Sequence, residues 1–352
     1  MQTSELDYDL PPELIAQEPV EPRDASKLLV LDRQSGLIEH RCFKDIGCYL
    51  KPGDLLVVND TKVLPARLKG EKSDTKAKVE ILLLTEQEPG TWEVLAKPAK
   101  RLKAGNLINF DENLQAEVAE KLENGRIILH FISSEPLLNV FQKIGQVPLP
   151  PYIVKPLLHP NRYQTIYAKK EESAAAPTAG LHFTPELIDD LKLEGIKFAH
   201  LTLKIGLDTF QPIREEKVEE HEIHSEYYEV SSEAADLLNE AKNSQNRIIA
   251  VGTTAVRVLE TLARRSFLPA GRHGANAQDD IGSMSGYTDL FIYPDYEFKM
   301  VDIMITNFHL PRSTLLAMVS AFSSPSKIKN AYAQAIKKHY RFFSFGDAML
   351  II

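Results

Sequence analysis

The first sixty residues of the chain alternate short apolar runs with turn-forming residues. The runs KLLVLDR (residues 27–33) and LLVVND (55–60) are typical of buried strands, and the turns QSG and KPGD separate such pieces. Short elements of both kinds follow one another in this region. The pattern predicts the beginning of an α/β domain.

Residues 63–150 have a different pattern, in which strand-like pieces are bounded by Gly, Asn, Asp or Pro. These pieces are KVEILLL, TWEVLAKP, NLINF, QAEVAEKL and RIILHF. Several such strands close together indicate a small antiparallel barrel or sandwich. The region ends in the proline-rich joint GQVPLPPYIVKPLLHP, where consecutive prolines exclude helix and favour an extended connector.

Helical and strand-like patterns alternate again after this joint. The predicted elements include a helix at 185–194, strands IKFAHLTLKI and RIIAV, and a strand TDLFIY at 288–293. Alternation of this kind implies crossover connections and a layered, mostly parallel sheet. We therefore predict a discontinuous α/β main domain (residues 1–62 and 151–352) that carries an inserted β-barrel domain (residues 63–150).

Composition and charge narrow the function classes. No apolar run approaches the length of about 20 residues that spans a bilayer, and the N-terminus is acidic, so we expect a cytoplasmic protein without membrane contact. The net charge of −8 argues against non-specific coating of nucleic acid. A local basic patch remains open at KPAKRLKAG (97–105), for which a solvated face is the ordinary interpretation.

The stretch SAAAPTAGLHFTPELIDDL (173–191) places small residues directly before a predicted helix. Thr184 suits the helix N-cap and Pro185 the first helical position, so free amide groups are expected nearby. Small side chains would let a ligand approach this backbone, with Thr178 and His182 as the polar groups at hand. The alternative is a tight packing turn with a satisfied histidine.

A second strand, turn and helix occurs in RIIAVGTTAVRVLE (247–260). The apolar strand ends at Gly252, Thr253 or Thr254 caps the helix, and Arg257 follows one turn later. Amides and a guanidinium that converge in this way suit a carboxylate or phosphate. Many joints of this type have no ligand.

Polar clusters also follow two other apolar strands. One comprises Asn59, Asp60, Thr61 and Arg67, and the other Thr306, Asn307 and His309. Since ligands gather at the carboxyl ends of parallel strands, both clusters could line one crevice. Turn chemistry is the alternative explanation.

Several standard sites are absent from the sequence. It contains no Gly-x-Gly, no Gly-Lys-Ser/Thr and no Gly-x-Ser-x-Gly, which argues against ordinary nucleotide loops and the serine nucleophile turn. His221, His224 and Glu226 lie close together, but no third ligand has a recognised spacing. We expect no metal.

Five motifs together resemble a known family. NDTKVLPARL, AAPTAGLHFT, GTTAVRVLE, TNFHLPRSTLLAMVSAF and YRFFSFGDAML occur in the order found in S-adenosylmethionine:tRNA ribosyltransferase-isomerases of queuosine biosynthesis. The resemblance implies an α/β domain with an inserted barrel. It also implies transfer and isomerisation of the ribosyl group of S-adenosylmethionine onto 7-aminomethyl-7-deazaguanine in the tRNA wobble position, giving epoxyqueuosine-tRNA, adenine and methionine.

The resemblance also implies partners. S-adenosylmethionine is consumed as a co-substrate and no cofactor is expected. The tRNA would carry a GUN-type anticodon, and the protein would be a monomer.

The resemblance also implies which residues take these roles. Proton transfer is expected of His182, with Asp60 as its partner or alternative, because acid and base groups with pKa values near neutrality suit this reaction. Lys97, Lys100, Arg101 and Lys103 would hold the tRNA backbone. Substrate contacts are expected from Arg67, Pro177, Thr178, Gly180, Phe183, Gly252, Thr253, Thr254, Arg257, Asn307 and His309.

Some positions depart from the family pattern. Lys204 stands where the family has histidine, Asp208 where it has glycine, and Glu172 replaces another glycine. These departures keep open an alternative, a catalytically inactive tRNA-anticodon-binding protein of the same fold. Transfer to a base outside tRNA is a weaker alternative.

Overall fold

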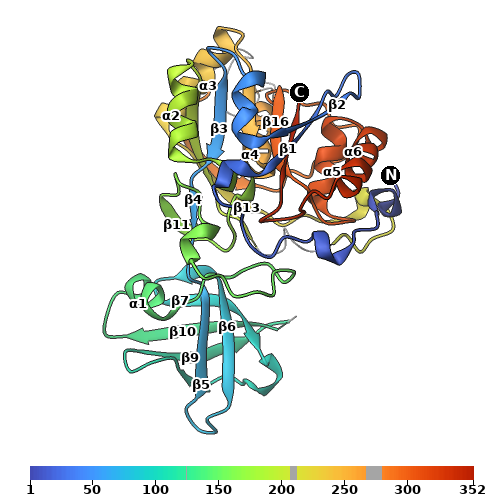
Figure 1. The fold of residues 1–352 in the computed structure, drawn as a ribbon. Helices are drawn as coiled ribbons and strands as arrows, with labels where there is room; N and C mark the ends of the chain where they lie inside the picture. Colours follow the sequence, from blue (N-terminus) through green and yellow to red (C-terminus); the bar gives the residue numbers. More distant parts are fainter. Residues whose placement is uncertain (124, 207–211, 267–279) are drawn as a thin grey trace. The chain divides into compact units, whose positions relative to one another are not determined.

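The computed structural model describes residues 1–123, 125–206, 212–266 and 280–352. The chain forms two compact units (Figure 1). The α/β unit comprises Met1–Thr61, Pro150–Lys170 and Ala176–Ile352, and the barrel unit comprises Lys62–Leu149 and Glu171–Ala175. A separate two-stranded sheet pairs β4 (Thr61–Val63) with β11 (Lys170–Ser173).

The α/β unit is built on a nine-stranded sheet in the order β15-β13-β12-β3-β14-β16-β17-β1-β2. Its central strands β12, β3, β14 and β16 are parallel, and antiparallel pairs flank them on both sides. The strand bounds are β1 Lys27–Leu31, β2 Ile38–Cys42, β3 Leu55–Asn59, β12 Lys197–Leu203, β13 Glu226–Val230, β14 Ile248–Val251, β15 Met284–Thr288, β16 Ile303–Asn307 and β17 Ala348–Ile351.

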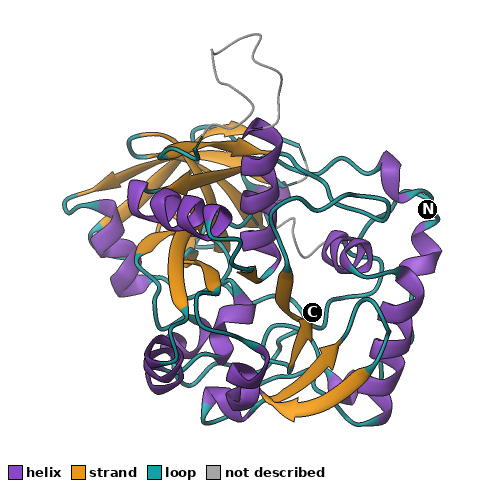
Figure 2. Ribbon diagram, turned by 90° about the horizontal axis from the view of Figure 1, so that it is seen from above, coloured by secondary structure: helices purple, strands orange, loops and turns teal. Residues whose placement is uncertain are grey.

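Helices cover both faces of this sheet, as alternate residues of β3 show. Leu55 and Val57 pack in one cluster with α3, α4, α5 and α6, whereas Leu56 and Val58 pack in another with α2. The burial of both faces explains the unbroken apolar run at 55–58. The helices are α2 Pro185–Leu193, α3 Ser232–Asn243, α4 Thr253–Ser266, α5 Thr314–Phe322 and α6 Pro325–Lys337, and Figure 2 distinguishes them from the strands.

Side-chain caps fix several helix starts. The Thr184 hydroxyl accepts the Leu187 N–H at 3.1 Å at the start of α2, and the Ser313 hydroxyl accepts the Leu316 N–H at 3.2 Å at α5. Gly195 follows α2 with a φ of +84°, a conformation that glycine adopts without strain. Capping of this kind contributes about 1 kcal/mol per helix.

The barrel unit contains a closed antiparallel barrel in the order β10-β7-β6-β5-β8-β9. Inward-facing residues such as Leu68, Ile81, Val94 and Leu129 form its core. Its strands are β5 Arg67–Lys72, β6 Lys78–Glu88, β7 Thr91–Lys97, β8 Leu107–Asn109, β9 Leu114–Lys121 and β10 Arg126–Ser133. Helix α1 (Leu137–Ile144) contributes Val140 and Phe141 to the same core and was not expected from the sequence.

These observations confirm the predicted fold class, an α/β sheet domain with an inserted antiparallel barrel. The strand expected at 288–293 is wrong, because β15 ends at Thr288. The Leu290 N–H donates to the Thr288 hydroxyl at 3.3 Å and not to a neighbouring strand, so the chain turns after Thr288. Leu290 and Ile292 are buried by core packing instead, so their alternation imitates a strand.

Candidate active site

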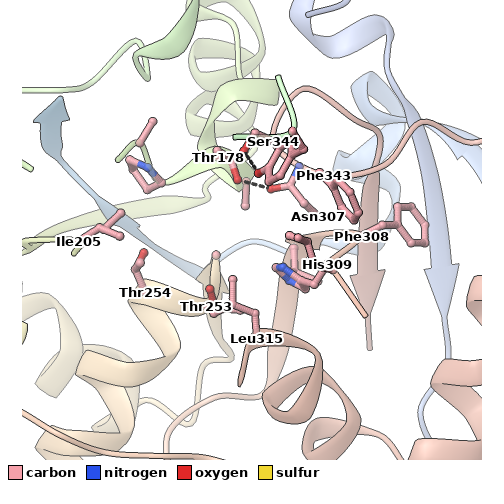
Figure 3. Close-up of a pocket in the computed structure, with 17 residues that line it drawn as sticks. Thr178, Ile205, Thr253, Thr254, Asn307, Phe308, His309, Leu315, Phe343 and Ser344 are labelled. Atoms are coloured by element: carbon pink, nitrogen blue, oxygen red, sulfur yellow. Dashed lines mark hydrogen bonds between the residues drawn. The ribbon is translucent and has the colours of Figure 1, made fainter. Parts of the chain in front are cut away.

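A cavity of the α/β unit lies where β14 and β16 end (Figure 3). It encloses about 530 Å³ of space between atoms, part of which is open solvent. Seventeen residues line it: Tyr152, Ala176, Pro177, Thr178, Ala179, Ile205, Gly252, Thr253, Thr254, Thr306, Asn307, Phe308, His309, Leu310, Leu315, Phe343 and Ser344.

The strand ends position the walls of this cavity. Gly252 follows β14 with a φ of +90°, and its N–H donates to the Ile305 carbonyl of β16 at 2.8 Å. A Cβ at Gly252 would lie 3.5 Å from the Ala179 methyl, so the turn at 252 and the small-residue stretch are in contact. The structure therefore brings together the two stretches that the sequence singled out.

The small-residue stretch does not lead straight into α2. Residues Thr178–His182 form a 3-10 turn, and the Thr184 side chain caps α2. The cavity is thus walled by Ala176–Ala179 and not by the amides of the α2 N-terminus. The α2 start, where a ligand was expected, therefore does not line this cavity, whereas the start of α4 at Thr253 and Thr254 does.

The cavity lining carries no charged side chain among the described residues. Burial lowers the pKa of His309 to about 3, and its Nε2 lies 2.7 Å from the Thr306 hydroxyl. Burial also raises the pKa of Tyr152 to about 12, and its hydroxyl lies 2.6 Å from Ser344 Oγ. Both titratable groups are therefore neutral near pH 7.

Aromatic rings form another part of the lining. The Tyr152 and Phe343 ring centroids are 4.9 Å apart, at an interplanar angle of 53°. Phe343 has a φ of +71°, which is rare for a bulky residue and carries a backbone cost of about 1–3 kcal/mol. Strain of this kind gathers at functional sites.

A hydrogen-bond chain runs from the cavity wall into the core. Thr178 Oγ1 donates to Asn307 Oδ1 at 2.8 Å, Asn307 Nδ2 lies 3.2 Å from His182 Nε2, and His182 Nδ1 lies 2.8 Å from Ser26 Oγ. Thr178 and Asn307 line the cavity, but His182 does not. The His182 ring is buried and stacks on the Phe43 ring, with the two ring centroids 5.0 Å apart.

The expected acid and base residues differ from this picture. Burial, with smaller contributions from Arg341 and Arg23, lowers the pKa of His182 to about 3, so His182 is a poor base at neutral pH. Asp60 is buried outside the lining, where Oδ1 accepts the Thr202 hydroxyl at 2.7 Å. The structure does not bring either residue to the cavity.

Three predicted substrate contacts also lie outside the lining. The Arg257 guanidinium is buried against the Glu226 carboxylate and donates to the Thr288 carbonyl at 3.1 Å. Phe183 is fully buried in the core beside Phe43. Gly180 lies under the Tyr167 hydroxyl, so its missing side chain makes room for that ring and not for a ligand.

The remaining predicted contacts divide between the two units. Seven of them line the cavity: Pro177, Thr178, Gly252, Thr253, Thr254, Asn307 and His309. Arg67 belongs to the barrel unit and pairs there with Glu80 at 3.1 Å. Lys97, Lys100, Arg101 and Lys103 are exposed residues of the same unit.

Several lining residues were not predicted, above all Tyr152, Ile205, Phe343 and Ser344. A signal was available for two of them, since Phe343 and Ser344 lie in the motif YRFFSFGDAML.

The three positions that depart from the family pattern are described by the structure only in part. Lys204 lies over the Tyr227 ring at 4.8 Å, whereas Asp208 lies outside the described residues and the side chain of Glu172 is not described.

Neither a metal cluster nor a membrane helix is found among the described residues. Within the described ranges, no three His, Cys, Asp or Glu side chains are placed to hold a metal ion. His221 Nδ1 instead lies 2.8 Å from Glu215, and Glu226 faces Arg257. No helix in the described part of the chain is long and apolar enough to span a bilayer.

The fold and the cavity define a class of protein, an α/β sheet protein with an inserted antiparallel barrel and a cavity without charged lining residues at the strand ends. The chain belongs to the queuosine biosynthesis protein family, whose model matches residues 3–351. This finding confirms the resemblance that the motifs indicated.

Relatives of known activity cover the whole chain. It is 53% identical to the S-adenosylmethionine:tRNA ribosyltransferase-isomerase of Staphylococcus haemolyticus and 51% identical to that of Staphylococcus aureus strain Newman, over 100% of both chains in each case. The crystal structure of S-adenosylmethionine tRNA ribosyltransferase from Thermotoga maritima is 43% identical, with a TM-score of 0.57 over 99% of this chain and 100% of that one.

Proposed function

We propose that the cavity of the α/β unit is the S-adenosylmethionine site of a tRNA ribosyltransferase-isomerase. The chain is an enzyme of this class in queuosine biosynthesis, with tRNA and S-adenosylmethionine as substrates. The observation that carries the proposal is a cavity at the strand ends that is lined by residues of four of the five family motifs. Nothing favours the alternative of an inactive tRNA-binding protein.

The neutral lining suits the chemistry of a sulfonium. The positive sulfur acidifies the neighbouring 5' carbon of the ribose, and an adjacent carboxylate would offset that charge. Among the described lining residues there is none. The faces of Tyr152 and Phe343 attract a cation without neutralising it, so the acidity of the C–H bond is retained.

Polar atoms of the cavity are available to hold the donor. Thr254 Oγ1 is buried and has no hydrogen-bond partner among the described residues, so a ligand group that binds it supplies the missing partner. Thr253 stands at the start of α4, where the first amides of a helix favour the methionine carboxylate, and Gly252 lies in the turn before it. Pro177, Thr178, Asn307 and His309 complete the proposed contacts.

The tRNA contacts are proposed for the barrel unit. Lys97, Lys100, Arg101 and Lys103 put four exposed positive charges within seven positions, in a chain of net charge −8. A local patch of this kind attracts a phosphate backbone. The proposed partner is a tRNA with a GUN-type anticodon, bound by a monomer in the cytoplasm, with no resident cofactor.

The products test the proposed reaction. Incubation with S-adenosylmethionine and tRNA that carries 7-aminomethyl-7-deazaguanine is expected to release adenine and methionine in equal amounts, with or without a chelator. The control is the same tRNA with guanine at the wobble position, which should give no release. Formation of S-adenosylhomocysteine would show methyl transfer instead and would contradict the proposal, and competition by free base would indicate a substrate outside tRNA.

A further inference from the structure

The chain of hydrogen bonds behind the cavity has a direction. His182 is neutral at pH 7, so one ring nitrogen carries a hydrogen and the other accepts. Asn307 Oδ1 already accepts from Thr178, which turns the Asn307 NH2 group toward His182 Nε2. His182 Nε2 is therefore the acceptor, and His182 Nδ1 donates to Ser26 Oγ.

The direction of the chain fixes what the cavity wall offers to a ligand. The only hydrogen of the Thr178 hydroxyl is used toward Asn307, so Thr178 presents lone pairs to the cavity. The Asn307 NH2 group uses one hydrogen toward His182 and keeps a second. The wall thus offers one acceptor and one donor side by side.

We propose that His182 is a positioning residue that holds Asn307 and Thr178 in this polarity, and that the pair selects a ligand edge with an amino donor beside a ring-nitrogen acceptor. In S-adenosylmethionine that edge belongs to the adenine, so this inference rests on the proposed function. An amide that was free to rotate would offer its oxygen and nitrogen in either order. Buried groups left unpaired by a wrong ligand are costly, which makes such a wall selective.

An analogue that exchanges the donor and the acceptor on this adenine edge tests the predicted arrangement of Thr178 and Asn307. In the deaminated analogue of S-adenosylmethionine, oxygen replaces the 6-amino group and the neighbouring ring nitrogen carries hydrogen, so donor and acceptor are exchanged. The measurement is kcat/KM for S-adenosylmethionine and for this 6-oxo analogue at saturating modified tRNA. Their ratio reports the discrimination and cancels general losses of activity.

For the wild-type enzyme, kcat/KM should be about tenfold or more higher for S-adenosylmethionine than for the analogue. This factor corresponds to the loss of about one hydrogen bond. Thr178→Val keeps the shape but removes the acceptor and should bring the ratio close to one, whereas Thr178→Ser, the matched control, should preserve it. His182→Phe should also lower the ratio, although residue 182 does not touch the cavity.

Several outcomes would overturn the proposal. One is a wild-type ratio near one or in favour of the 6-oxo analogue, and another is an unchanged ratio in Thr178→Val. Equal losses for both donors in His182→Phe would assign His182 a merely structural role. If His182→Phe does not fold, Ser26→Ala removes the acceptor of the His182 Nδ1–H. An unchanged kcat/KM ratio in Ser26→Ala would also contradict the proposal. A wild-type enzyme that turns over neither donor would defeat the proposed function as well.

Discussion

The hydroxyl of Tyr167 lies over the α-carbon of Gly180, where an added Cβ would fall 2.0 Å from the phenolic oxygen. The second nearest atom to that position is Thr165 Cγ2, at 2.9 Å. Both neighbours belong to the same unit as Gly180. The glycine in this motif is therefore required by the packing of the protein's own side chains.

Gly180→Ala should destabilise the protein by about 1–3 kcal/mol, because the methyl group overpacks this contact. Chemical denaturation measures the loss. Gly282→Ala is the matched control, since a Cβ at that position meets nothing within 4 Å. Equal stability of the two variants would contradict the contact.

Tyr167→Phe should rescue Gly180→Ala. The Tyr167 hydroxyl has no hydrogen-bond partner among the described residues, so its removal frees space without breaking a bond. The double variant should recover part of the stability, because the contact with Thr165 Cγ2 at 2.9 Å remains, and the coupling energy in a double-mutant cycle should exceed about 0.5 kcal/mol. Additive losses would place the clash elsewhere.

Arg257→Met should lower stability more than it changes the KM for S-adenosylmethionine. The guanidinium is buried against Glu226, and removal of one partner of a buried pair costs about 3–5 kcal/mol. Denaturation and steady-state kinetics on the same preparation separate the two effects. A stable variant with a greatly raised KM would restore Arg257 as the group that binds the methionine carboxylate.

Acid should destabilise the protein through His182 and His309. Burial holds both pKa values at about 3 in the folded state, whereas an exposed histidine titrates near 6.5, so between these values only the unfolded chain binds the protons. Their contribution to the free energy of unfolding is complete above pH 6.5. It declines as the pH falls, by up to ~1.4 kcal/mol per pH unit for each histidine. Urea denaturation from pH 7.5 to 5 should give a shallower dependence for His182→Phe, and an identical slope would contradict the neutral histidine.

Replacement of Lys97, Lys100 or Lys103 by alanine should weaken tRNA binding, and the size of the loss should depend on the salt concentration. Each phosphate that Lys97, Lys100 or Lys103 no longer neutralises lowers the slope of log affinity against log salt by about 0.7–0.9. Binding titrations at several salt concentrations measure this slope. Lys78→Ala is the control, because Lys78 pairs with Glu71 at 3.1 Å, and an equal effect of that variant would remove the special role of the patch.

The sequence was a good guide wherever local pattern and final environment agree. The apolar run at 55–58 predicted a buried strand, and polar residues after β14 and β16 predicted a ligand site at Gly252–Thr254 and Asn307, which line the cavity. It failed at positions whose environment is set by distant residues. Nothing near Arg257 in the sequence indicates Glu226, and nothing near Gly180 indicates Tyr167.

His182 shows the same limit in a finer form. The family resemblance indicated a reactive group, but burial keeps the His182 ring neutral. The stack on Phe43 and the hydrogen bonds to Asn307 and Ser26 hold the ring behind the cavity wall. Phe343 shows the converse. Its ring lines the cavity and its backbone has a φ of +71°, and side-chain patterns reveal neither.

The central claim is that the cavity between the 178 turn, the start of α4 and the end of β16 receives the sulfonium donor. A crystal structure with the non-reactive analogue in which CH–NH3⁺ replaces the sulfonium tests this claim most directly. We expect the analogue in contact with Thr254, Asn307 and Phe343. An analogue bound elsewhere, with this cavity filled only by water, would contradict the account.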